Sequence, residues 1–289
     1  MARRRRRAAD DDEARFLASY DASSFERPSV AVDVALLSVS EGALWTVLLH
    51  RSEHPHRGRY ALPGGFVGIR EPLGGAAARV LARKCGVSDV FLEQLYSFGD
   101  PGRDPRTRVI SVAHVALVDR TRLLQASAGS NTLVHARLDV PWEGETGGPV
   151  EARRADGAAL PLAFDHADIL GMAVKRIRGK LDYAPIGFQL LPPRFTLLEL
   201  QRVHETILAR PLNKDSFRRR MLASGQLEAW GRKKNACPRP ERMSAPRRKR
   251  RTNMLASDLR WWTGPHRRIC AMAGLLSSAL QIADRRVNR

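Results

Sequence analysis

The chain has 289 residues, 43% of them hydrophobic, and carries 49 Lys/Arg against 30 Asp/Glu, a formal net charge of +19. This is enough for one large domain or two smaller ones. Three scattered cysteines, Cys85, Cys237 and Cys270, argue against a disulfide framework or a zinc site. The longest late apolar run, ICAMAGLLSSALQIA, is shorter than the roughly 20 residues that span a membrane. We therefore expect a cytoplasmic protein with no membrane partner.

The positive charge is concentrated at one end of the chain. Residues 210–289 contain 21 Lys/Arg and 5 Asp/Glu, a net of +16. A basic region joined to a balanced one is typical of proteins that bind polyanions, with nucleic acid as the first candidate and an anionic membrane surface as the second.

The first two-thirds of the chain predict a charged tail and a mixed domain. Residues 1–26 alternate charged blocks with small residues and are expected to form a flexible tail. Within residues 27–163, alternating segments such as VAVDVALL and RVISVAHVALV predict strands. EPLGGAAARVLARKCG predicts a helix, with Pro72 in its first turn and Gly86 after its last. Strands and helices joined by short loops indicate an α+β domain.

Residues 164–235 predict a helical unit. FDHADILGMAVKRIRGK has an apolar stripe and Asp165 as N-cap. TLLELQRVHETILAR begins with a capping box formed by Thr196 and Glu199, and the basic segment NKDSFRRRMLAS follows after a tight turn. Helix, turn, basic helix and the strand-like QLEAW is the order of a winged helix-turn-helix. The proline-rich, basic residues 236–289 are expected to be a disordered extension.

Residues 64–87, GGFVGIREPLGGAAARVLARKCGV (the box segment), carry a spaced motif. Glu71 lies six residues after Gly65, and Arg79 lies eight residues after Glu71. The segment resembles the Nudix box, G-x5-E-x7-R-E-U-x-E-E-x-G-U, where U is aliphatic. The resemblance implies an α/β/α sandwich and, in members that are enzymes, a metal-dependent pyrophosphatase site.

The metal-binding positions of that motif are changed here to Val80, Arg83 and Lys84. Carboxylates at this spacing share one helix face and can hold Mg²⁺ or Mn²⁺, whereas one apolar and two cationic side chains repel a divalent ion. We therefore expect no catalytic residues and no metal, with Glu71 and Arg79 as vestiges that pair and brace the loop against the helix. Mg²⁺ or Mn²⁺ would be needed only by a hydrolase with ligands from outside the box.

A pocket kept for binding is the alternative to a damaged enzyme. Residues 92–118 resemble the Nudix-related transcriptional regulators (the NrtR group) and the ADP-ribose pyrophosphatases nearest to them. Arginines in the loop of this segment can donate two parallel hydrogen bonds to a phosphate. Ion pairs with Asp100 and Asp104 are the alternative, and both can form together. Arg83 and Lys84 either contact a phosphate directly or form a solvated helix face. The predicted nucleotide-binding residues are Gly64, Gly65, Phe66, Arg83, Lys84, Arg103 and Arg106.

Residues 181–232 resemble the C-terminal winged helix of the same regulators. The predicted DNA-binding residues are Lys214, Ser216, Arg218, Arg219, Arg220, Arg232, Lys233 and Lys234. The first two are expected to read base edges, the arginines of the helix to contact phosphates, and the last three to form a wing against the backbone. The alternative is a solvated basic helix in a small α-helical subdomain. The regulators complete the wing with a second strand, which the sequence after residue 235 does not predict.

Together these features predict a DNA-binding transcription regulator. A catalytically degenerate Nudix domain would sense ADP-ribose or a related nucleotide, and a winged helix would bind double-stranded DNA, as a homodimer on a palindromic site. The resemblance implies control of NAD-related or pentose-related genes. Two alternatives stay open: a Nudix hydrolase of the ADP-ribose pyrophosphatase type, and a polyanion-binding protein dominated by its basic tail.

Overall fold

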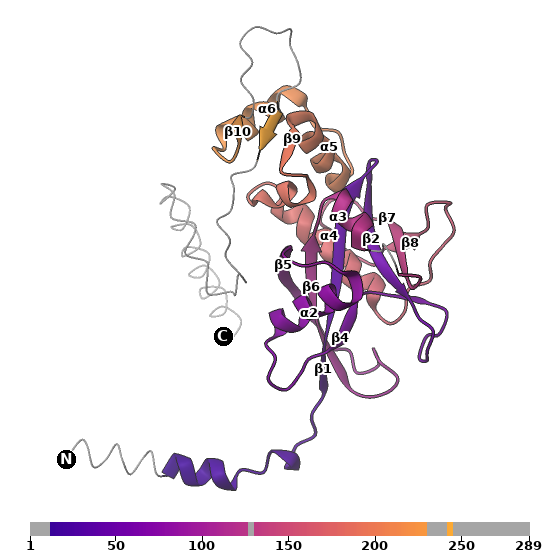
Figure 1. Ribbon diagram of the computed structural model, residues 1–289, viewed down its shortest axis with the longest axis vertical. Coiled ribbons are helices and arrows are strands. Elements are labelled where there is room, and N and C mark those ends of the chain that lie inside the picture. Colours follow the sequence, from indigo (N-terminus) through magenta and orange to yellow (C-terminus); the bar gives the residue numbers. More distant parts are fainter. Residues whose placement is uncertain (1–11, 127–129, 230–241, 245–289) are drawn as a thin grey trace, which may run out of the picture. The chain divides into compact units, whose positions relative to one another are not determined.

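The computed structural model describes residues 12–126, 130–229 and 242–244 (Figure 1). Its main sheet has the strand order β5-β6-β1-β2-β7-β8, with β3 paired to β2 and β4 paired to β1. The strands are β1 (Ser29–Ser40), β2 (Ala43–His50), β3 (Tyr60–Ala61), β4 (Gly64–Phe66), β5 (Phe91–Phe98), β6 (Val109–Leu117), β7 (Leu133–Asp139) and β8 (Glu151–Arg153). The sheet is mixed because β1 and β6 run parallel while the other pairings are antiparallel.

The central strand β1 is buried on both faces, which explains its nearly continuous apolar sequence. Successive side chains of a strand point to opposite faces. Val32, Val34 and Leu36 accordingly join one apolar cluster, and Ala35 and Leu37 join the other. The two clusters are the two cores of a three-layer domain.

Helices cover both faces of the sheet. α2 (Leu73–Cys85) and α3 (Arg120–Ala126) supply side chains to the cluster on one face, and α4 (His166–Lys180) supplies them to the other. α2 ends at Gly86, whose φ of 64° is a left-handed conformation that favours glycine. The predicted α/β/α sandwich is confirmed.

The packing of α4 brings it against the sheet, although the predicted boundary at residue 164 groups this helix with the winged helix. Ile169, Leu170 and Ala173 are fully buried in the cluster formed with the sheet. A stripe of apolar side chains indicates that one face of a helix is buried, but it does not indicate which element covers that face. The sequence alone therefore does not say how α4 packs.

A second unit follows α4. It contains η2 (Pro185–Leu190), β9 (Arg194–Thr196), α5 (Leu197–Leu208), α6 (Lys214–Ala223), β10 (Glu228–Ala229) and β11 (Arg242–Ser244). Figure 1 shows α5, α6, β9 and β10 grouped together. The apolar residues Phe195, Leu200, Phe217 and Met221 form its core. This arrangement confirms the predicted winged helix.

Two segments are more ordered than the sequence indicated. The backbone of β11 pairs with β10 and β9, so the wing has the second strand that we did not predict, inside the extension expected to be disordered. Residues 12–19 are helical, and η1 (Ala22–Ser24) follows, where a flexible tail was expected. Alanine, glutamate and arginine favour a helix, a preference that the charged composition concealed. Among the described residues, no helix has the length and apolar character to cross a bilayer.

Candidate functional site

The box segment begins at β4, which lies against β1. Gly64 pairs with Asp33 and Gly65 pairs with Val32. A Cβ atom at Gly64 would lie 2.0 Å from Oδ1 of Asp33 and 2.9 Å from the carbonyl oxygen of Val32. Glycine is therefore required at residue 64 so that the loop backbone can approach the Asp33 carboxylate.

Glu71 and Arg79 brace the loop as predicted. Arg79 donates to the two carboxylate oxygens of Glu71 at 2.6 and 2.7 Å, and it also donates to the carbonyl of Phe66. Glu71 accepts a further bond from the backbone N–H of Gly68. The hydrogen bonds from Arg79 are the main reason that the pKa of Glu71 falls to about 2. The remaining acid of the box is thus already fully paired.

The three altered positions do not fit a divalent metal. Val80 is 2% exposed and lies in the apolar core beneath the sheet. Arg83 is exposed, and the ammonium of Lys84 donates to the carbonyl oxygen of Gly64 at 2.5 Å. Loss of hydration lowers the pKa of Lys84, although the Asp33 carboxylate opposes this. Within the described residues there is no group of three or more His, Cys, Asp or Glu that could hold a metal ion.

A buried polar cluster that sequence reasoning missed lies behind Gly64. Asp33 is 8% exposed and accepts a bond of 2.6 Å from the hydroxyl of Ser111. Nδ1 of His166 accepts the backbone N–H of Leu62, so its proton is on Nε2, which is 3.6 Å from Asp33. Burial lowers the pKa of His166 and favours the neutral ring. An aspartate in the middle of the apolar run VAVDVALL is the signal that could have found this cluster.

Arg103 belongs to the same cluster, and its predicted contact with a nucleotide stays a prediction. Its side chain is 4% exposed and forks onto Asp165 at 2.7 and 2.8 Å, with Asp33 3.4 Å away. A buried guanidinium needs carboxylate partners, and both are close by. Asp165 occupies the N-cap position of α4 as predicted, but its carboxylate binds Arg103 instead of capping the helix.

Arg106 forms an ion pair within its own loop, which is the alternative interpretation of the loop arginines. It donates to Asp104 at 3.0 and 2.7 Å, and its side chain is 49% exposed. The hydrogen bond from Arg106 lowers the pKa of Asp104. Half of the Arg106 side chain faces solvent, and its predicted contact with a nucleotide stays a prediction.

The second candidate site is the basic helix α6. Asn213 caps it by accepting the N–H of Ser216, and the predicted capping box of α5 is formed by Thr196 and Glu199. Phe217 and Met221 point into the core of the winged helix, which leaves the basic side chains outside. The exposed residues of α6 that were predicted to contact DNA are Lys214, Ser216, Arg218, Arg219 and Arg220. Arg232, Lys233 and Lys234 lie outside the described residues.

Arg220 of α6 is directed toward the chain that follows α4. It donates to Asp182 at 3.1 Å and lies over the ring of Phe217, 5.8 Å from the ring centre. The side chains of Arg220 and Asp182 are 47% and 71% exposed. Arg220 is therefore engaged internally, and a phosphate would have to compete with Asp182 for it.

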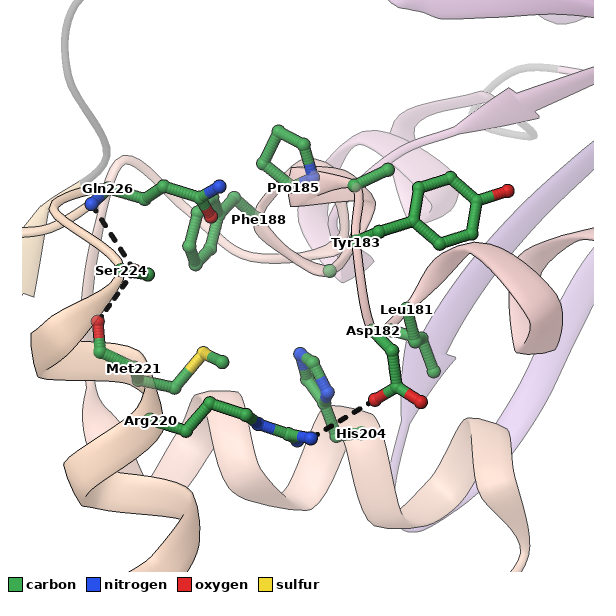
Figure 2. A pocket seen from close by; sticks show the side chains of 12 residues that line it. Leu181, Asp182, Tyr183, Pro185, Phe188, His204, Arg220, Met221, Ser224 and Gln226 are labelled. Atoms are coloured by element: carbon green, nitrogen blue, oxygen red, sulfur yellow. Dashed lines mark hydrogen bonds and ion pairs between the residues drawn. The ribbon is translucent and has the colours of Figure 1, made fainter. Parts of the chain in front are cut away.

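Asp182 and Arg220 border a cavity of about 80 Å³ that no sequence pattern indicated (Figure 2). Figure 2 shows His204 of α5 between Arg220 and the segment with Asp182. Its ring packs edge-on against Phe217, and its buried Nδ1 has no hydrogen-bond partner among the described residues. Burial lowers the pKa of His204 to about 4, so the ring is neutral at physiological pH.

This geometry defines a class of protein, a Nudix-type sandwich whose described residues include no carboxylate set for metal, joined to a winged helix with an exposed basic helix. Residues 187–243 match a family model described as the NrtR DNA-binding winged helix domain. The chain is 36% identical over 233 residues to the ADPR responsive transcriptional repressor NtrR of Acinetobacter baylyi, which covers 80% of this chain and 87% of that protein. The chain belongs to the NrtR family of Nudix-related transcriptional regulators.

Solved structures agree with this assignment. Shewanella oneidensis NrtR in complex with a 27mer DNA matches with a TM-score of 0.61 and 31% identity, over 75% of this chain and 92% of that chain. A MutT/nudix family protein from Enterococcus faecalis matches with a TM-score of 0.66 and 26% identity, over 81% of this chain and 93% of that chain. Both matches extend across most of the described residues, so the order of the two domains is shared as well.

Proposed function

We propose that this protein is a transcription regulator that binds DNA through α6 and the wing, and that its sandwich domain binds ADP-ribose or a related nucleotide as an effector. The altered box is the main observation that supports the proposal. It keeps the loop geometry through Glu71 and Arg79 but offers cations where an enzyme needs carboxylates. The A. baylyi relative is named for its response to ADPR, which supports ADP-ribose as the first effector to test.

The sandwich domain binds its nucleotide without hydrolysing it. Hydrolysis of a pyrophosphate needs an activated water and neutralisation of the phosphates, which Nudix enzymes obtain from bound metal. The test is incubation of the protein with ADP-ribose and Mg²⁺ or Mn²⁺, with release of AMP followed by chromatography. No turnover is expected. Turnover that Glu71→Gln abolishes would instead support the ADP-ribose pyrophosphatase alternative.

The winged helix recognises a specific operator. Contacts from α6 to phosphates supply affinity and contacts to base edges supply discrimination. Fluorescence anisotropy at physiological salt separates sequence-specific from nonspecific binding. It compares DNA from the protein's own promoter region with random DNA. Tighter binding to the promoter fragment, changed by ADP-ribose, is expected. Equal binding to both would favour the polyanion-binding alternative.

The protein acts as a homodimer and needs no metal cofactor. A two-fold symmetric dimer places two copies of α6 on the two halves of a palindromic site. Light scattering coupled to size exclusion, with and without operator DNA, measures this state directly. A monomer that binds one half-site with full affinity would contradict it.

A further inference from the structure

Two oxygen acceptors lie at Gly64 in the box segment, its own carbonyl and the carboxylate of Asp33. Lys84 reaches back from the last turn of α2 and donates to this carbonyl. The Asp33 carboxylate lies directly against Gly64, as the missing room for a Cβ atom shows. Carbonyl and carboxylate oxygens are the ligands of hard divalent cations. Here the Gly64 carbonyl accepts from the ammonium of Lys84, and the Asp33 carboxylate, which also lies 3.4 Å from Arg103, adds a favourable negative charge near that ammonium.

Lys84 is one of several cations of the box segment, and the acid of the box does not pair with it. Glu71 is matched by Arg79, and Val80 contributes no charge. The helix end also favours a cation, since the last carbonyls of α2 carry partial negative charge. A resident ammonium is thus stable at this place without an ion, whereas a divalent ion would meet Lys84 and Arg83 at short range.

We propose that Lys84 takes the place of the divalent cation, so that its ammonium, seated on the Gly64 carbonyl, contacts the diphosphate of the effector and makes effector binding independent of metal. This inference rests on the proposed function, since it concerns the nucleotide site of the sandwich. An ammonium has three donors and no acceptor. One donor holds Gly64, and the others are available to phosphate oxygens. Exposed Arg83, one residue earlier, adds a second positive charge.

The experiment is isothermal titration of the full chain with ADP-ribose and separately with ADP, each in EDTA and in Mg²⁺. The wild-type affinity for both ligands should be the same within about two-fold in the two buffers. Lys84→Met should weaken binding about ten- to hundred-fold in both, which is the value of one charge-assisted hydrogen bond. Lys84→Arg should keep most of the affinity. Lys84→Glu should bind very weakly in EDTA and recover in part with Mg²⁺, because it restores one carboxylate.

Lys175→Met is the matched control. Lys175 also donates its ammonium to a backbone carbonyl, that of Thr146, but it lies on α4. Its loss should leave nucleotide affinity unchanged, and thermal unfolding of every variant checks that it folds.

The outcomes separate the inference from the proposed function. A wild-type protein that binds only with Mg²⁺, or a Lys84→Met variant that binds like wild type, overturns the inference while the regulator stands. Binding of ADP but not of ADP-ribose, with the same dependence on Lys84, keeps the inference and rejects ADP-ribose as effector. If neither ligand binds in either buffer, both the inference and the nucleotide site are rejected.

Discussion

Arg178 is a buried cation whose replacement by methionine tests how the sandwich and the winged helix are joined. The residue is 3% exposed. Its guanidinium donates to the carbonyls of Ile207 at 2.7 Å, Gly144 at 2.8 Å and Trp142 at 3.2 Å, and it lies 4.7 Å from the centre of the Trp142 ring. Arg178 therefore links α4, the last turn of α5 and the loop after β7. Methionine keeps the apolar stem and removes every donor.

The expected loss is about 3–5 kcal/mol, the range for breaking a buried charged network and leaving its partners unpaired. In a protein of this size that corresponds to a fall in Tm of roughly 6–20 °C. The free energy of unfolding is measured by urea denaturation, followed by far-UV circular dichroism and by tryptophan fluorescence.

Arg176→Met is the matched control from the same helix. Arg176 donates to Glu93 and to the carbonyl of Leu95, but its side chain is 34% exposed. Its removal should cost about 1 kcal/mol or less. If Arg178→Met also costs less than about 1 kcal/mol, or if the two variants lose equal stability, the reasoning from burial is refuted.

Three further predictions follow from the cavity and the box. Asp182→Asn removes the ion pair of Arg220 and should therefore tighten DNA binding. In anisotropy titrations the salt dependence of binding should become steeper by about one phosphate contact. An unchanged slope would show that Arg220 does not reach DNA. The pKa of His204 is lowered to about 4 in the folded protein, whereas the ring of the unfolded chain protonates near pH 6.5. The free energy of unfolding should therefore fall by about 3 kcal/mol as the pH drops from about 6.5 to about 4. His204→Leu should remove most of this loss in urea denaturation, and an equal loss in both proteins would contradict it. The pairing of Glu71 with Arg79 stabilises the fold above the ordinary carboxyl pKa of 4.5 and is lost as pH falls through about 2. Glu71→Gln should flatten acid unfolding in that window, as followed by circular dichroism.

The sequence predicted the elements that depend on local pattern. The strands β1 and β6 alternate or run apolar, α2 ends at Gly86, and the capping box of Thr196 and Glu199 specifies where α5 begins. The pairing of Glu71 with Arg79 was also predictable, because both lie in one spaced motif. In each case the residues that decide the structure are close together in the chain.

The features that were missed depend on contacts across long separations. Arg103 meets Asp165 and Asp33, which are 62 and 70 residues away in the sequence. No pattern around Arg103 distinguishes a buried ion pair from an open phosphate contact. β11 was missed for a similar reason, because a short strand at the edge of a wing is defined by its pairing with β9 and β10 rather than by its own alternation.

Helix α5 has a consequence for how an effector can act on DNA binding. Leu197 and Leu200 lie in the core of the winged helix, while Val203 and Ile207 lie in the core shared with the sheet. A helix with one end committed to each core cannot serve as a hinge, since bending there would expose apolar side chains to water. In the proposed homodimer, we therefore expect an effector bound in the sandwich to change the spacing of the two subunits, or to shift α6 and the wing against a stationary α5. Crosslinks placed between α5 and the sheet should leave such a response intact.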